Sequence, residues 1–187
     1  MWLQHPRTSN SYWQAILVVP DPKHEAAVSA LENLYRNYQY HGKPYAREVV
    51  RNTLSKPLVL LIPQRGGSLT REYYPDLYVM GGRSRKIDVC EVWHSESEDS
   101  AIADVLHSFL IPDVRFLGIV CTGNNLSKSE AQALIDPLWR YFSEALVPEK
   151  QNELLRDRNY AISQPDSTTL ANPKALEELL RREFRLS

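Results

Sequence analysis

The sequence has few of the features that would cross-link the chain or anchor it in a membrane. It contains two cysteines, Cys90 and Cys121, and each lies inside an apolar run. Isolated cysteines in such runs are usually buried thiols, so we expect neither a disulfide nor a thiolate metal site. No apolar run approaches the roughly 20 residues that span a bilayer, and the N-terminus lacks the apolar core of a signal peptide. We therefore expect a cytoplasmic protein with no membrane partner.

An excess of one charge is also missing. The net charge is −1 at pH 7 and the isoelectric point is about 6.5. Proteins that bind nucleic acid unaided usually carry a basic excess, because neutralising phosphates supplies much of the affinity. The overall charge therefore leaves nucleic-acid binding as an alternative only for local groups of residues. Two groups of residues could serve it, although a solvated turn and ordinary packing are the simpler interpretations: the cations Arg83, Arg85 and Lys86, and the aromatics Tyr73, Tyr74, Tyr78 and Trp93.

Common catalytic and metal-binding motifs are absent from the sequence. It has no Cys-x-x-Cys pair, no phosphate-binding glycine loop and no Gly-x-Ser-x-Gly element. Its five histidines do not have the spacing of metal ligands. These absences argue against a zinc site, a nucleotide-binding loop and a serine hydrolase of the α/β type.

The composition is typical of a globular protein with one main domain. Hydrophobic residues make up 43% of the 187 residues and charged residues 24%, which is close to the average. We expect one domain over residues 1–148, followed by a polar linker and an amphipathic C-terminal helix over 149–187. The apolar stripe of that helix consists of Leu176, Leu179, Leu180 and Phe184. It is too short to be stable alone, so it must pack on its own domain or on another chain.

The hydrophobic pattern predicts a mixed α/β fold with a central mixed sheet and helices on both faces. Apolar runs predict strands over 12–20, 58–62 and 114–121, and helical spacing predicts helices over 22–40, 44–54, 97–110 and 127–146. Ser127 and Glu130 form a capping box at the start of the last of these helices. Residues 69–93 predict a β-hairpin with its turn between Arg83 and Ser84.

The register of this hairpin brings two acidic residues together. With that turn, opposed residues have numbers that sum to 167, so Tyr78 faces Val89 and Asp76 faces Glu91. Opposed residues point to the same side of a sheet and lie about 5 Å apart. Two carboxylates at that distance either repel each other or share a cation such as Mg²⁺. The simpler alternative is that Asp76 pairs with an arginine such as Arg71 or Arg115.

The Pro75-Asp76 dipeptide, the hairpin and Glu91 together resemble the core of the PD-(D/E)XK nucleases. The resemblance covers residues 44–121, whose predicted order is α-β-β-β-α-β. It implies that Asp76 and Glu91 hold one or two divalent metals that activate water for phosphodiester cleavage. It also implies a glutamate on the preceding helix, for which Glu48 is the nearest match.

The sequence departs from this family at the catalytic lysine, whose position is Trp93. Tryptophan brings no charge to the attacking water or the phosphate. Residues 96–114, which include the next predicted helix, contain no lysine or arginine, and their one histidine is His107. We therefore expect a non-catalytic interaction subunit on a nuclease-like scaffold, which binds a protein partner or a second copy and needs no cofactor. The alternatives are a Mg²⁺-dependent endonuclease, with Lys56 or Arg71 as the substitute base, and an unrelated α/β protein.

Overall fold

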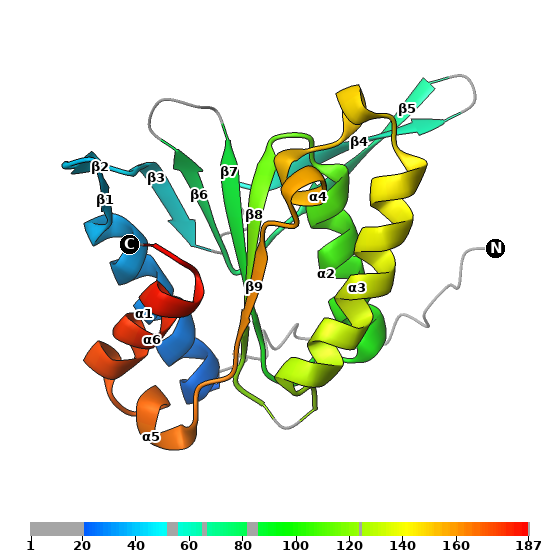
Figure 1. The fold of residues 1–187 in the computed structure, drawn as a ribbon. Coiled ribbons are helices and arrows are strands. Elements are labelled where there is room, and N and C mark those ends of the chain that lie inside the picture. The colour runs from blue at the N-terminus through cyan, green and yellow to red at the C-terminus, as the bar shows by residue number, and fades with distance from the viewer. Residues whose placement is uncertain (1–20, 52–55, 65–66, 82–85, 124, 187) are drawn as a thin grey trace, which may run out of the picture.

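The computed structural model describes residues 21–51, 56–64, 67–81, 86–123 and 125–186. A five-stranded mixed sheet with the order β3-β6-β7-β8-β9 forms the centre of the protein (Figure 1). Its strands are β3 (Ala46–Arg51), β6 (Leu77–Gly81), β7 (Ile87–Trp93), β8 (Val114–Cys121) and β9 (Tyr160–Ser163). β6 runs antiparallel to both of its neighbours, β3 and β7, whereas β7, β8 and β9 run parallel to one another.

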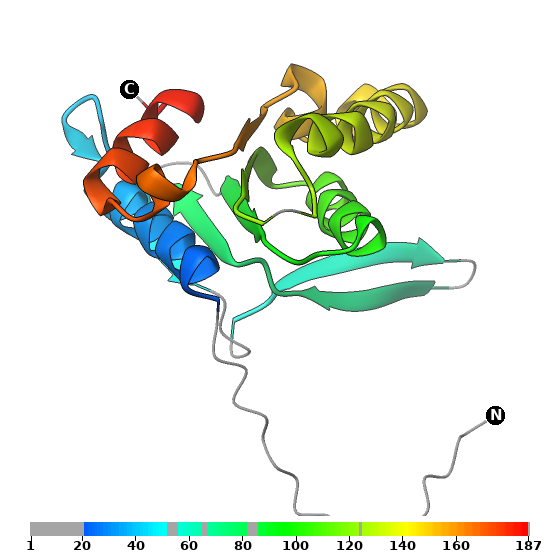
Figure 2. The same cartoon turned by 90° about the horizontal axis from the view of Figure 1, so that it is seen from below.

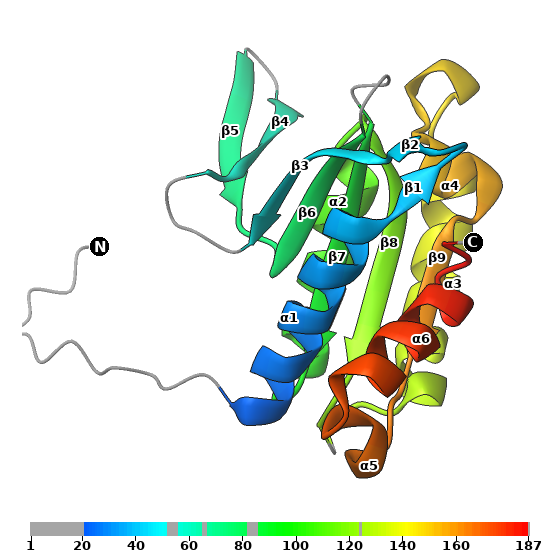
Figure 3. The same ribbon diagram turned by 90° about the vertical axis from the view of Figure 1, so that its left-hand side faces the viewer.

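Helices cover both faces of this sheet, as the hydrophobic pattern predicts. One face carries α1 (Pro22–Asn37), α5 (Ser167–Leu170) and α6 (Pro173–Glu183), onto which Figure 3 looks directly. The other face carries α2 (Glu98–Leu110), α3 (Lys128–Ala145) and α4 (Glu153–Asp157). Each face has its own apolar core, and the alternation along β7 divides its residues between them.

The antiparallel pair of β4 (Leu58–Gln64) and β5 (Gly67–Tyr73) forms a separate two-stranded sheet. Figure 2 shows this pair lying along α2, outside the central sheet. We predicted one long hairpin arm from residue 69 to 81, but the arm is interrupted after Tyr73. Pro75 has no N–H group to donate within a ladder, which accounts for the interruption.

The helix predicted over 44–54 is wrong. The short strands β1 (Gln39–Tyr40) and β2 (Lys43–Pro44) pair with each other, and β3 follows and pairs with β6. Val49 packs into the core beneath α1, whereas Val50 packs into the opposite core. Adjacent valines that face opposite sides are typical of a strand with both faces covered, a context that the local sequence does not reveal.

The elements between Ile87 and Ala145 agree closely with the prediction. The strand β8 has the predicted bounds, and Ser97 caps α2 by accepting a hydrogen bond from the Ser100 N–H. Ser127 and Glu130 form the predicted capping box at the start of α3. Both cysteines are buried and free.

The segment predicted as a polar linker is part of the fold. It contains the short helix η1 (Pro148–Lys150), α4, and the fifth strand of the sheet, β9, which pairs with β8. Leu154 and Leu155 are fully buried, which the polar surroundings of this pair conceal in the sequence. Asn152 is also buried, and its amide group donates to the carbonyl oxygens at the end of α2.

The C-terminal helix packs on its own domain, against α1 (Figure 3). Leu176, Leu180 and Phe184 are buried in the core that α1 shares with the sheet, whereas Leu179 is half-buried. The ring of Phe184 lies against Gly118 of β8, where a side chain would have no space. Of the two placements that the sequence left open, the structure therefore has the one within the domain.

Three predictions fall outside the described residues: the strand over 12–20, the hairpin turn between Arg83 and Ser84, and the cations Arg83 and Arg85. Within the described ranges, no helix is long and apolar enough to cross a membrane.

Candidate functional site

Asp76 and Glu91 meet at the end of the central hairpin, where the register of the sequence prediction is confirmed. Tyr78 pairs with Val89 and Met80 with Ile87. Asp76 lies directly before β6, and its backbone N–H donates to Oε2 of Glu91 at 3.3 Å. The Glu91 carboxylate therefore contacts the backbone of Asp76.

Glu91 is the more buried of the two acids, with 5% of its surface exposed. The Tyr73 hydroxyl donates to Oε1 of its carboxyl group. Burial raises the pKa of Glu91 well above 4.5, and the charges of Asp104 and Asp76 raise it further. The protein therefore disfavours the anionic form of Glu91, which is the form that binds a metal.

Both carboxylate oxygens of Asp76 have partners within the protein. Oδ2 accepts a hydrogen bond from the Val92 N–H at 2.8 Å. Oδ1 lies 3.2 Å from Nε2 of His24, which extends from the first turn of α1. The hydrogen bond to Asp76 is the largest cause that raises the pKa of His24. Asp76 thus joins the hairpin to α1, and the arginine partners considered from the sequence are wrong. Arg115 instead forms a bidentate pair with Asp88.

Asp104 of α2 is a third carboxylate in this cluster. Burial raises its pKa to about 7, and the charges of Asp76 and Glu96 contribute. The indole N–H of Trp93 acts in the opposite direction and lowers the pKa of Asp104. Nε1 of Trp93 is nevertheless buried without a partner at hydrogen-bonding geometry among the described residues. Burial and like-charge repulsion between Asp104, Asp76 and Glu91 therefore favour the protonated forms of Glu91 and Asp104.

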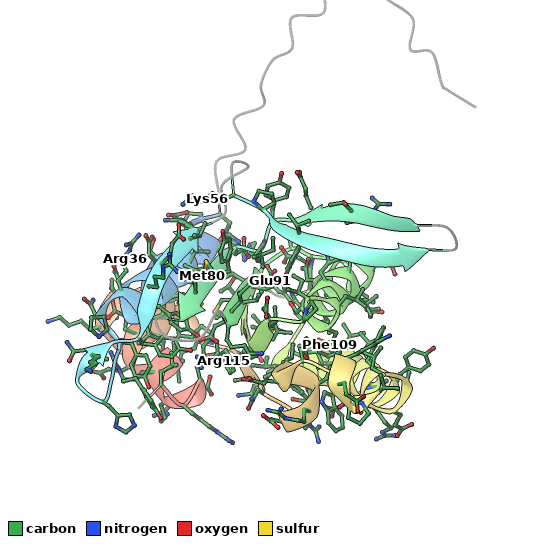
Figure 4. All side chains as sticks on the ribbon, turned by 90° about the horizontal axis from the view of Figure 1, so that it is seen from above. Arg36, Lys56, Met80, Glu91, Phe109 and Arg115 are labelled. Atoms are coloured by element: carbon green, nitrogen blue, oxygen red, sulfur yellow. The ribbon has the colours of Figure 1, made fainter. Side chains whose placement is uncertain are left out.

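Trp93, for whose position the resemblance implies a lysine, is 2% exposed. Neither of the cations suggested as substitutes forms an ion pair with Asp76 or Glu91 among the described residues. Lys56 forms an ion pair with Glu48 and is well separated from Glu91 in Figure 4. Burial lowers the pKa of His107, and the positive charge of Arg71 lowers it further.

The structure does not bring Glu48 to the acidic pair. Glu48 lies on β3, not on a helix, and it pairs across the sheet with Met80. Met80 is four residues from Asp76, which places Glu48 about 13 Å along the strand from Asp76 at about 3.3 Å per residue.

Three members of the cluster were missed by the sequence reasoning: His24, Tyr73 as a hydrogen-bond donor, and Asp104. Asp104 follows Ala101 by three residues and precedes Ser108 by four, and both of these residues are fully buried. This helical spacing was a usable signal that Asp104 faces the core side of α2. The contact of His24 could not be found without the placement of α1 against the sheet.

The oxygens of Asp76 and Glu91 already have hydrogen-bond partners within the protein. Mg²⁺ prefers ionised carboxylate oxygens and keeps several waters in near-octahedral geometry. Here the oxygens of Asp76 and Glu91 accept hydrogen bonds from Tyr73, Val92 and the Asp76 N–H. In the part of the chain that the structure describes, no group of three or more His, Cys, Asp or Glu side chains is placed to hold a metal.

Comparisons with protein-family models, with curated proteins and with solved structures found no match for this chain.

Proposed function

We propose that the protein is a non-catalytic interaction subunit, built on a scaffold like that of the PD-(D/E)XK nucleases, which binds a protein partner. The order of the elements supports the scaffold. The chain passes through α1, β3, β6, β7, α2 and β8, which is the α-β-β-β-α-β order of the family, with the pairs β1–β2 and β4–β5 as two insertions. The family's first helix then corresponds to α1 rather than to residues 44–54.

The observation that carries the proposal is the internal use of the acidic pair. A metal-dependent nuclease needs carboxylate oxygens that are free to bind its cation. In this protein the oxygens of Asp76 bind His24 and the Val92 N–H, and Glu91 is buried beneath the Tyr73 hydroxyl. These contacts stabilise the junction of hairpin, α1 and β5, which is a structural role.

The replacement of the lysine by Trp93 supports the same conclusion. A lysine at that position supports the nucleophile and the negative charge of the transition state, and the loss of such a group commonly costs a factor of about 100–1,000 in rate. Because Trp93 packs in the core with Val89 and Ile119, its indole ring serves packing between the sheet and α2.

The alternative function is a Mg²⁺-dependent endonuclease that cleaves DNA or RNA, with Asp76 and Glu91 as the metal ligands. One observation favours it. Asp104 adds a third carboxylate to the pair, and the repulsion that raises the pKa of Glu91 and Asp104 would be relieved by a divalent cation.

A cleavage assay separates the two functions. Purified protein is incubated with Mg²⁺ or Mn²⁺ and with labelled single-stranded and double-stranded DNA and RNA, beside the variant Asp76→Asn. We expect no cleavage above the level of the variant. Metal-dependent cleavage by the wild type that Asp76→Asn abolishes would establish the endonuclease instead, whereas cleavage that survives in the variant is a contaminant.

A further inference from the structure

The central sheet ends in β9, whose outer edge has no neighbouring strand among the described residues. Because the N–H of Leu117 donates to the Asn159 carbonyl, the parallel ladder directs the backbone groups of residues 159, 161 and 163 toward β8. The groups of Tyr160 and Ile162 point outward. The Tyr160 N–H bonds to the Arg158 carbonyl. That leaves the Tyr160 C=O and both backbone groups of Ile162 without a partner in the described chain.

This edge forms the floor of a groove of about 290 Å³ between α3 and α6. Figure 2 shows β9 between these two helices, with α6 on one side and α3 on the other. Phe116 and Phe184, whose rings meet edge to face at 5.5 Å, form an apolar wall on the α6 side. On the α3 side, the amide group of Gln132 donates a hydrogen bond to the Tyr160 hydroxyl at 2.8 Å. This wall of the groove is therefore polar.

The charged side chains that line the groove are mainly cationic. They are Lys128, Arg158 and Arg185, with Glu183 as the only carboxylate among the described lining residues. Arg185 has no side-chain partner in the described part of the chain. Lys128 reaches Glu183 across the groove at 3.2 Å, and both side chains are partly exposed. Such exposed pairs are weak and readily exchanged for another carboxylate. The second oxygen of Glu183, Oε2, is buried without a hydrogen-bond partner among the described residues.

The two arginines of the groove both occupy an unfavourable backbone conformation. Arg158 has φ 52° and Arg185 has φ 54°, in the left-handed region that glycine and asparagine adopt more readily. Arg158 ends α4, and Arg185 follows α6. Here each of the two side chains lines the groove.

We propose that the β9 edge binds an extended, acidic peptide segment of another protein, which adds to the sheet as a sixth strand. This inference rests on the proposed function as an interaction subunit and specifies the chemistry of the partner. Backbone groups of the peptide pair with Tyr160 and Ile162, as in other cases of strand addition. Alternate side chains of the peptide face opposite walls. Apolar ones face Phe116 and Phe184, and acidic ones approach Arg185 and Lys128, because Arg158 is already paired with Asp136. A second copy of the chain fits less well, because it would bring the same cations together.

The test uses the full chain and a fluorescein-labelled hexapeptide of alternating glutamate and valine. Fluorescence anisotropy should show saturable binding that weakens as salt is added. Binding should be lost when lysine replaces each glutamate, and also when proline replaces the central valine, because proline cannot donate a hydrogen bond. Amide exchange measured by NMR should slow at Ile162 when the first peptide binds.

Arg185→Gly removes one groove cation at a position that favours glycine. We expect this variant to bind the acidic peptide about two- to fivefold more weakly, with a melting temperature no lower than that of the wild type. The matched control is Lys174→Ala, which removes an exposed cation of α6 that does not line the groove. The control should bind as the wild type does.

Three results would overturn the inference: no binding of the acidic peptide, equal binding of the acidic and lysine peptides, or unchanged binding by Arg185→Gly. Sedimentation of a dimer that Arg185→Gly alters would assign the edge to a second copy instead. None of these results bears on the cleavage assay. Conversely, cleavage dependent on Asp76 would remove the proposed function and leave peptide binding as a separate property.

Discussion

Replacing Asp104 by asparagine should stabilise the protein at neutral and alkaline pH. The pKa of this buried carboxyl group is raised from 3.8 to about 7. Each pKa unit corresponds to about 1.36 kcal/mol, so keeping Asp104 ionised costs the folded state about 4 kcal/mol. Asparagine has the same shape and no charge. Because the carboxylates interact with one another, we expect Asp104→Asn to raise the free energy of unfolding by about 2–4 kcal/mol at about pH 8.

The sign of the pH dependence follows from which state holds the proton. Below about pH 4 both states are protonated, so Asp104 contributes nothing to the pH dependence. Between about pH 4 and pH 7 the unfolded chain loses the proton while the folded chain keeps it, and the contribution of Asp104 lowers stability as pH rises. Above about pH 7 the full cost remains. The wild type should therefore lose stability over this window relative to Asp104→Asn.

Urea unfolding at about pH 4, 6 and 8 measures the effect. The matched control is Asp113→Asn, which removes an exposed carboxylate directly before β8 and should change stability by less than about 0.5 kcal/mol. If Asp104→Asn is no more stable than the wild type at about pH 8, or if the difference between them does not grow from about pH 4 to 8, the carboxylates do not form the strained cluster described above.

Three further substitutions test individual contacts within the fold. Gly118→Ala would place a methyl group 2.5 Å from the ring of Phe184, so the ring and α6 must move, and calorimetry should show a loss of about 1–3 kcal/mol. Asn152→Ala removes an amide that donates to three carbonyl oxygens and a cap that accepts from the Leu155 N–H, and urea unfolding should show a loss of about 2–4 kcal/mol. His24→Gln removes a partner of Asp76. Because the pKa of His24 is raised in the folded state, the loss should be fully present below about pH 6.5 and should disappear as pH rises through the folded pKa, which unfolding at about pH 5.5 and 9 measures.

The sequence predicted those features that depend on local chemistry. The register of the β6–β7 hairpin was predicted from the turn position and from alternation along residues 77–93, and the strand pairs that the structure describes have that register. The capping box at Ser127 and the bounds of β8 are equally local. Contact between Asp76 and Glu91 follows from the same register. It could therefore be predicted without knowledge of the rest of the fold.

The features that were missed depend on distant parts of the chain. The adjacent valines of β3 fit a helix stripe or a doubly covered strand, and only the positions of α1 and β6 decide between them. The strand β9 has four residues, and it forms because it pairs with β8, about 40 residues earlier in the chain. The internal partners of the acids, His24 and Tyr73, come from α1 and β5. Their side chains carry no sign in the local sequence that they bind carboxylates.

The most direct test of the account is a titration of the protein with Mg²⁺ and Mn²⁺ at about pH 8, followed by calorimetry and by the melting temperature. At this pH a metal would have to displace the partners of Asp76 and Glu91, whose oxygens bind His24, Tyr73 and Val92. The account predicts no saturable heat at millimolar metal and the same melting temperature with metal as with EDTA. A rise in melting temperature that saturates with metal, and that is absent in Asp76→Asn, would contradict it and show that the acidic pair is a metal site.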